Sequence, residues 1–262
     1  MTSQELDLHS IALLEHESIG LPETHVRALA LFRDSVVRPS LLVVDGEIRA
    51  NDASDEPGAA FFEGDLAELH QATVEGYLLT VQSMWERGLR GLLVKRDKRL
   101  CGGQNVERLH RANWSNDTKG LQSHFERLLA VPLSAFDSYS DLDLLQNLGN
   151  AIRHGDGQSA KRVHELAPSL WWNWFPPGTT YDAGPFKVSV PADWPAHPSF
   201  DKVTLTEAVL EQMIHAVSGF WTDIECIRCN SFRRIDETVR RRLDAWPAER
   251  EQRRRTRFWT PT

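Results

Sequence analysis

One amphipathic stretch decides the fold class: residues 61–94 read FFEGDLAELHQATVEGYLLTVQSMWERGLRGLLV. Apolar residues recur along it, mostly three, four or five positions apart, and they are Phe62, Leu66, Leu69, Val74, Tyr77, Leu78, Val81, Trp85, Leu89 and Leu92. Such spacing is typical of a helix with one buried face, here sustained over about nine turns. The stretch therefore predicts a long helix, with Gly88 and Gly91 marking a bend near its end.

The chain on both sides of this stretch predicts further helices. We expect them, in chain order, within 1–37 and over 119–130, 141–154, 159–166 and 204–247. Either Ser138 or Ser140 can cap the helix over 141–154. Thr204 and Glu207 form a capping box for the last helix, whose apolar face continues as far as Pro247.

Three segments interrupt the helical pattern. Residues 41–48 are strand-like around an Asp45-Gly46 turn signal and predict a small β excursion, and residues 95–103 predict a basic loop. Between residues 169 and 198 the chain contains six prolines, which exclude a long helix. Its rings are Trp171, Trp172, Trp174, Phe175, Tyr181, Phe186 and Trp194. We expect an ordered insert with a strand over 186–190, its rings packed on the helices; a base-stacking surface and a protein–protein surface are the alternatives.

The predicted architecture is mostly α: a bundle of long antiparallel helices with an irregular aromatic and proline-rich insert and a small β excursion. Residues 1–58 form an N-terminal helical and loop extension. The bundle spans 59–232 and contains the insert at 169–200. Residues 233–262 form an arginine-rich C-terminal helix and tail.

Composition limits the class of protein. The chain has 262 residues, 41% of them hydrophobic and 26% charged, with three cysteines and no apolar run of the length that a membrane helix needs. We expect no secretory signal and a cytoplasmic protein without membrane contact. The net charge of −7 conceals an asymmetry, because residues 233–262 carry ten arginines against five acidic residues. That end, at +5, predicts either contact with nucleic acid or an acidic partner, or a solvated helix with a frayed tail.

The helix over 141–154 carries the candidate site. On a helical wheel Leu145, Leu148 and Ile152 face the core, and the opposite side presents Asp143, Asn147, Asn150 and His154, flanked by Gln146 and Arg153. A histidine at a helix C-terminus is held near the negative end of the dipole and can act as a general acid or base. Carboxamides can bind ribose, phosphate or base. The competing interpretation is that His154 and Asn150 only tie down the helix end and the 155–157 loop.

Residues 145–157, LQNLGNAIRHGDG, resemble the terminal motif of the HEPN superfamily (higher eukaryotes and prokaryotes nucleotide-binding). The resemblance extends over about 61–232 and implies a helical bundle, usually dimeric. Many members are metal-independent endoribonucleases of toxin–antitoxin and antiphage-defence systems. His154 matches the family histidine and Asn150 its frequent polar neighbour. The family arginine, five to seven residues before the histidine, is replaced here by Asn147, Leu148 or Gly149.

Two functional hypotheses follow from the resemblance. In the first, the chain is an RNA-cleaving effector: His154 is the acid or base, Asn150 assists it, Arg153 or an arginine of 233–257 supplies positive charge, and Asn147 and Gln146 bind substrate. In the second, the chain is a non-catalytic HEPN-like subunit, a homodimer or part of a complex with a defence-system protein. The absence of the family arginine favours the second hypothesis and the Asn150–His154 face favours the first.

No other motif points to a cofactor or a metal. Cys226 and Cys229 form a Cys-x-x-Cys pair without a second pair nearby, so we expect both to pack as small apolar groups. His110 and His124 are expected to be solvated.

Overall fold

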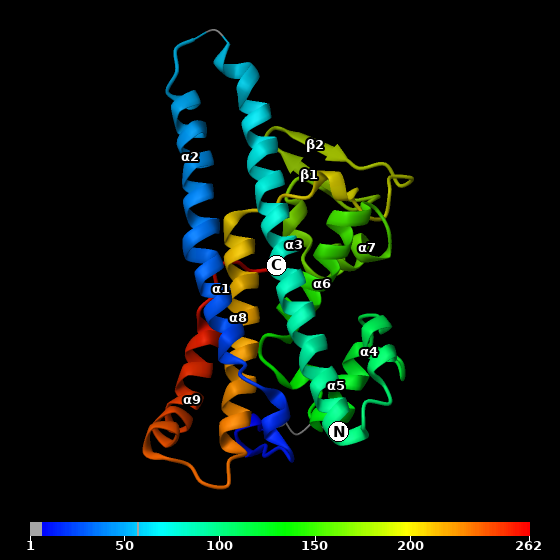
Figure 1. Cartoon of the computed structure of the whole chain (residues 1–262). Coiled ribbons are helices and arrows are strands. Elements are labelled where there is room, and N and C mark those ends of the chain that lie inside the picture. Colours follow the sequence, from blue (N-terminus) through cyan, green and yellow to red (C-terminus); the bar gives the residue numbers. More distant parts are fainter. Residues whose placement is uncertain (1–6, 57) are drawn as a thin grey trace.

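The computed structural model describes residues 7–56 and 58–262 and is mostly helical, which confirms the predicted fold class (Figure 1). The helices are α1 (Glu23–Phe32), α2 (Arg38–Asp52), α3 (Ala59–Cys101), α4 (Val106–Arg111), α5 (Leu121–Leu129), α6 (Tyr139–His154), α7 (Gln158–Leu166), α8 (Glu207–Asn230) and α9 (Glu237–Arg255). The strands are β1 (Thr180–Ala183) and β2 (Phe186–Ser189). Short 3-10 helices occupy Leu8–Ser10, His16–Ile19, Leu133–Ala135, Pro168–Trp171 and Phe200–Lys202. Figure 1 shows α2 and α3 as an antiparallel pair whose connected ends project beyond the other helices.

The long helix predicted over 61–94 is confirmed as α3 and extends further at both ends. It continues through Gly88 and Gly91, and the predicted basic loop at 95–103 is wrong because the helix ends only at Cys101. Gly102, with φ of +66°, provides the left-handed residue that terminates it. Gly88 serves close packing: a Cβ placed there would lie 2.7 Å from Cζ2 of Trp221 on α8.

The strand-like segment 41–48 lies within α2, so the β excursion predicted there is wrong. Leu41 and Val44 are buried and Ile48 is half-buried, and their spacing of three and four places them on one face of a helix that packs against α3. Arg33–Val37 is a π-helical turn that connects α1 to α2. Packing on α3 therefore overrides the strand propensity of the branched side chains.

Helix α8 lies at the centre of the bundle. Thr206, and not Thr204, caps it, because the Thr206 side chain accepts a hydrogen bond from the backbone N–H of Val209 at 3.5 Å. Its Phe220 stacks on Trp85 of α3 with ring centroids 5.1 Å apart. These aromatic contacts join the two longest helices of the bundle.

The last helix predicted from the sequence is not continuous to Pro247, because α8 ends at Asn230 and α9 begins at Glu237. Asp236 caps α9 by accepting a hydrogen bond from Val239 N at 2.9 Å, and Pro247 lies inside the helix. Trp246 is buried beside it and donates to Asp223 of α8 at 2.7 Å. Contacts with α8 thus hold the helix on both sides of the proline.

The insert forms a β-hairpin, in which β1 pairs antiparallel with β2 and Ala183 lies opposite Phe186. The strand predicted over 186–190 is confirmed as β2. The expectation that the rings pack on the helices is met only in part. Trp171 is buried and donates its indole N–H to Ser199 O at 2.9 Å, whereas Trp172, Phe186 and Trp194 are exposed.

Candidate functional site at the end of helix α6

Helix α6 forms as predicted and holds the candidate site at its C-terminal end. Leu145 and Leu148 are buried, and Ile152 is half-buried. The helix ends at His154, followed by Gly155 with φ of +67°, a backbone conformation that favours glycine. At the other end, Ser138 occupies the cap position, but its side chain makes no capping hydrogen bond.

The structure brings Gln146, Asn150 and Arg153 together against α3. Gln82 of α3 donates to Gln146 Oε1 at 3.2 Å. Arg153 donates one N–H to Gln82 Oε1 and another to Asn150 Oδ1, the latter at 3.3 Å. Gln82 is fully buried, whereas Arg153 is exposed, so the interior of the protein anchors a guanidinium group at the surface.

A second α3 side chain, Glu86, completes this polar network. It accepts hydrogen bonds from Gln82 at 2.6 Å and from Gln146 at 3.3 Å, and its ion-pair partner is Arg90 at 2.8 Å. Burial acts to raise the pKa of Glu86, but the hydrogen bond and charge of Arg90 and the two amide donors outweigh burial and hold the pKa below its usual value. Glu86 is therefore a carboxylate at neutral pH, and Arg90 neutralises it.

Arg153, by contrast, has no counter-ion among the described residues. Within the described residues no carboxylate oxygen lies within 4.0 Å of its guanidinium, whose side-chain acceptors are the amide oxygens of Gln82 and Asn150. An exposed cation held by neutral acceptors can attract an anionic ligand such as a phosphate.

His154 lies where the sequence predicts it, at the exposed C-terminal end of α6. Its ring makes no hydrogen bond to any part of the chain that the structure describes, so both ring nitrogens can meet a ligand. Since Asn150 precedes it by four residues and contacts Arg153, an amide, a cation and an imidazole share this helix end.

Asn147 belongs to a separate cluster. Its side chain donates to the backbone O of Asp143 at 2.8 Å. The Asp143 carboxylate accepts from Trp114 Nε1 at 2.8 Å and pairs with Arg162 at 3.4 Å. The structure therefore does not place Asn147 with Gln146, Asn150 and Arg153, although all four lie on one helix.

The loop after His154 anchors the aromatic insert, a contact that spacing along the chain did not predict. Asp156 accepts hydrogen bonds from Ser199 Oγ and from the backbone N–H of Phe200, both at 2.6 Å. These bonds hold the pKa of Asp156 below its usual value. An aspartate between two glycines is the local signal of such a tether, but its partner, more than forty residues away, follows only from the tertiary fold.

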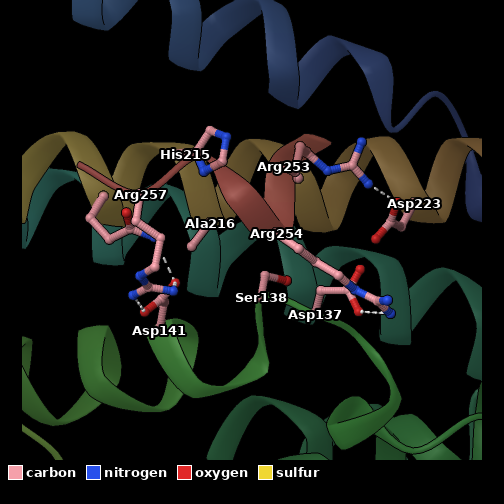
Figure 2. A pocket seen from close by; sticks show the side chains of 11 residues that line it. Asp137, Ser138, Asp141, His215, Ala216, Asp223, Arg253, Arg254 and Arg257 are labelled. Carbon is pink, nitrogen blue, oxygen red and sulfur yellow. Dashed lines mark hydrogen bonds and ion pairs between the residues drawn. The ribbon is translucent and has the colours of Figure 1, made fainter. Parts of the chain in front are cut away.

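The arginine-rich end is docked on the bundle, so the predicted frayed tail is wrong. Figure 2 shows three ion pairs around a cavity of about 140 Å³ between α6, α8 and α9. They are Arg257–Asp141 at 2.8 Å, Arg254–Asp137 at 2.7 Å and Arg253–Asp223. Ser138 and His215 also line the cavity. These arginines bind carboxylates of their own chain, and the cavity walls combine both signs of charge.

The cysteines behave as predicted and one histidine does not. Cys226 and Cys229 are buried free thiols, and burial raises their pKa values to about 12 and about 11. His124, expected to be solvated, is buried and accepts a hydrogen bond from Arg127 at 3.0 Å, while His110 is exposed as expected. Among the described residues no group of three or more His, Cys, Asp or Glu side chains is placed to hold a metal ion.

The fold and the site thus define a mostly helical protein with an imidazole, an amide and a guanidinium at one helix end. No helix in the described part of the chain is long and apolar enough to span a membrane. Comparison with protein-family models, with curated proteins and with solved structures finds no match.

Proposed function

We propose that this chain is a HEPN-like, metal-independent endoribonuclease that acts at the end of α6. The observation that carries the proposal is the guanidinium of Arg153, which lacks a carboxylate partner within the described residues and is hydrogen-bonded to Asn150 beside the exposed His154. Phosphoryl transfer to a ribose 2′-hydroxyl requires two groups: a general acid–base and a fixed cation.

In this mechanism His154 accepts the proton of a ribose 2′-hydroxyl, and the oxygen attacks the adjacent phosphorus. The bond from phosphorus to the 5′-oxygen breaks, and the leaving oxygen takes up a proton from water. Arg153 stabilises the negative charge on the pentavalent phosphorane, in place of the arginine that the HEPN motif has earlier in the helix. Asn150 fixes the guanidinium, and Gln146 supports it through Gln82. The products are a 2′,3′-cyclic phosphate and a 5′-hydroxyl.

The test is cleavage of single-stranded RNA in the presence of EDTA, with analysis of the product ends. We expect His154→Ala to abolish cleavage and Arg153→Ala to lower the rate by about 100-fold or more, the usual effect of losing one group that stabilises transition-state charge. His110→Ala, at an exposed histidine on α4, is the matched control and should leave the rate unchanged. Intact RNA with the wild type, or undiminished cleavage by His154→Ala, would overturn the proposal.

The same proposal includes the setting that the HEPN resemblance implies. The chain would be a cytoplasmic component of a prokaryotic toxin or antiphage-defence system, active as a homodimer or in a complex with a partner protein. Substrate RNA would be its nucleic-acid partner.

A second candidate function, a non-catalytic scaffold subunit, is favoured by the α2–α3 pair. Leu42, Val43, Phe61 and Phe62 are 64%, 65%, 82% and 59% exposed on these projecting helices (Figure 1). Large exposed apolar side chains on such a projection are typical of an association surface. The scaffold function predicts that His154→Ala preserves assembly and biological function, while Phe61→Ser with Phe62→Ser disrupts assembly, as measured by light scattering after gel filtration. A monomeric wild type without a co-purifying partner would contradict it.

A further inference from the structure

The aromatic insert forms an open cavity of about 530 Å³, a volume within the range of about 300–1,000 Å³ that small-molecule sites occupy. Its principal lining side chains are Trp174, Phe175, Tyr181, Trp194, His197 and Ser199. None of the sequence motifs and no part of the helix-end site accounts for it. An aromatic surface that lies open to a ligand needs an explanation.

Two stacked rings are among the lining side chains of this cavity. Phe175 and Tyr181 are stacked, with ring centroids 3.8 Å apart and planes inclined by 3°. Trp194, which is 52% exposed, lines the same cavity from the turn that follows β2. Planar π surfaces of this kind accept another planar ring by stacking, and such stacking does not depend on which base provides the ring.

The polar groups around the cavity suit the edge of a base and a phosphate. Ser189, Ser199 and Asn173 contribute hydroxyl and amide groups, and Lys202 contributes a cation that pairs with Asp201 at 3.8 Å. Within the described residues none of the lining side chains is a carboxylate. The buried indole N–H of Trp174 also has no acceptor among these residues. The wall thus offers donors and acceptors and does not repel an anion.

The cavity is tied directly to the proposed catalytic end of α6. Ser199, in the cavity lining, donates to Asp156, and Asp156 follows His154 by two residues. The aromatic insert is thus tethered to the loop that follows His154. We propose that this cavity binds one nucleobase of a nucleotide unit, either in single-stranded RNA or in a free nucleotide.

A proline-rich peptide is the competing occupant, since aromatic grooves also bind such segments. The nucleotide is favoured for two reasons. Lys202, the only cationic residue in the described lining, is exposed and its contact with Asp201 is a loose 3.8 Å. Arg153, which has no carboxylate partner among the described residues, lies three residues before the Asp156 that tethers the insert. A peptide of that type would gain nothing from either charge. This inference rests on the proposed function only for the placement of the RNA strand, because binding of the base is independent of cleavage.

The experiment measures binding by titration calorimetry in the His154→Ala background, which keeps the RNA intact. The probes are hexaadenylate, adenosine 5′-monophosphate, ribose 5-phosphate as the baseless control, and a decapeptide of proline. Trp194→Ala removes a half-exposed ring of the cavity. Trp172→Ala is the matched control, because this ring is 74% exposed and lies outside the lining. Thermal melts followed by circular dichroism verify that both variants are folded.

We expect hexaadenylate or adenosine monophosphate to bind, with affinity at least about tenfold lower for Trp194→Ala and unchanged for Trp172→Ala. Tighter binding of the hexamer identifies RNA as the source of the base, and equal binding identifies a free nucleotide. Equal affinity for ribose 5-phosphate, no effect of Trp194→Ala, or binding of the peptide alone would overturn the inference. Base binding without RNA cleavage by the wild type would overturn only the proposed ribonuclease function.

Discussion

Gly88 sets the distance between α3 and α8, because it has no side chain at the point where two rings meet it. Trp221 stacks on His25 with ring centroids 4.2 Å apart, and a Cβ on Gly88 would lie 2.7 Å from Trp221 and 3.1 Å from His25. Gly91, one turn further along the same helix, has nothing within 4 Å of its Cβ position. A change to alanine is therefore expected to have opposite effects on stability at these two glycines.

We predict that Gly88→Ala lowers the free energy of unfolding by about 1–3 kcal/mol, since the added methyl group pushes Trp221 and His25 away from α3. Gly91→Ala should raise it by about 0.5–1 kcal/mol, because alanine is the better helix former where space is open. Urea denaturation of both variants measures the difference. If both were stabilised, the close approach of Trp221 would be contradicted.

Gln82 is the residue through which the interior holds the proposed site. We predict that Gln82→Leu costs about 1–3 kcal/mol of stability, because Gln146 loses its buried donor. Arg153 would also lose its anchor on α3, so RNA cleavage should fall through kcat more than through KM.

Gln104→Leu is the control for that prediction. Gln104 is exposed, and its substitution should change stability by no more than about 0.5 kcal/mol and leave cleavage as in the wild type. Unchanged kinetics in Gln82→Leu would show that Arg153 needs no anchor.

At the scale of elements, the sequence predicts helices wherever one periodic face meets the core, as in α3 and α6. It fails where two signals compete. In α2 the branched run that includes Val43 and Val44 has strand propensity, yet packing on α3 determines a helix. In α9 a proline normally ends a helix, yet the buried Trp246 and Arg250 on either side hold it. Tertiary contacts decide both cases, and a single sequence does not contain them.

The candidate site shows the same division between local and long-range information. Residues 145–157 place His154, Asn150 and Arg153 on one helix end, and the structure has them there. The contribution of Gln82 and the tether from Asp156 to Ser199 join segments far apart in the sequence. Neither partner can be predicted from local spacing, because each lies far away along the chain.

Helix α9 is held by a buried carboxylate, and its docking provides a prediction at this scale. Asp223 accepts from Trp246 and Arg253, and Arg250 lies 3.6 Å away. Burial raises the pKa of Asp223, and the arginines act in the opposite direction. We predict that Asp223→Ala lowers the free energy of unfolding by about 3–5 kcal/mol, because it leaves buried donors without their acceptor.

Trypsin provides a direct readout of α9 docking, since the protease cleaves after arginine. Rapid cleavage within 250–257 is expected for Asp223→Ala and slow cleavage for the wild type. Glu251→Ala removes an exposed partner of Arg255 and should leave both the urea midpoint and the cleavage pattern close to wild type. Equal trypsin sensitivity of Asp223→Ala and the wild type would contradict this account of the docking.

At the scale of the whole molecule, burial makes the fold sensitive to acid. It is the main cause that lowers the pKa values of four histidines on different elements, aided by a nearby cationic or imidazole side chain in each case. The four are His25, His124, His164 and His215. Since the unfolded chain titrates near the usual histidine value of 6.5, it binds more protons than the folded chain below that pH.

We therefore predict that the urea midpoint is constant above about pH 7 and falls as the pH drops below about 6.5. Asp223, whose pKa is raised, acts in the opposite direction, because its protonation favours the folded state as the pH falls. Near pH 6 four histidines with lowered pKa values outweigh one carboxyl group with a raised pKa, so stability decreases as the pH falls. His164→Gln should give a shallower decline between pH 7.5 and 5.5, because it removes one ring that the unfolded chain protonates more readily. A midpoint that rose over this interval would mean that the carboxyl, and not the imidazoles, dominates the pH dependence of the fold.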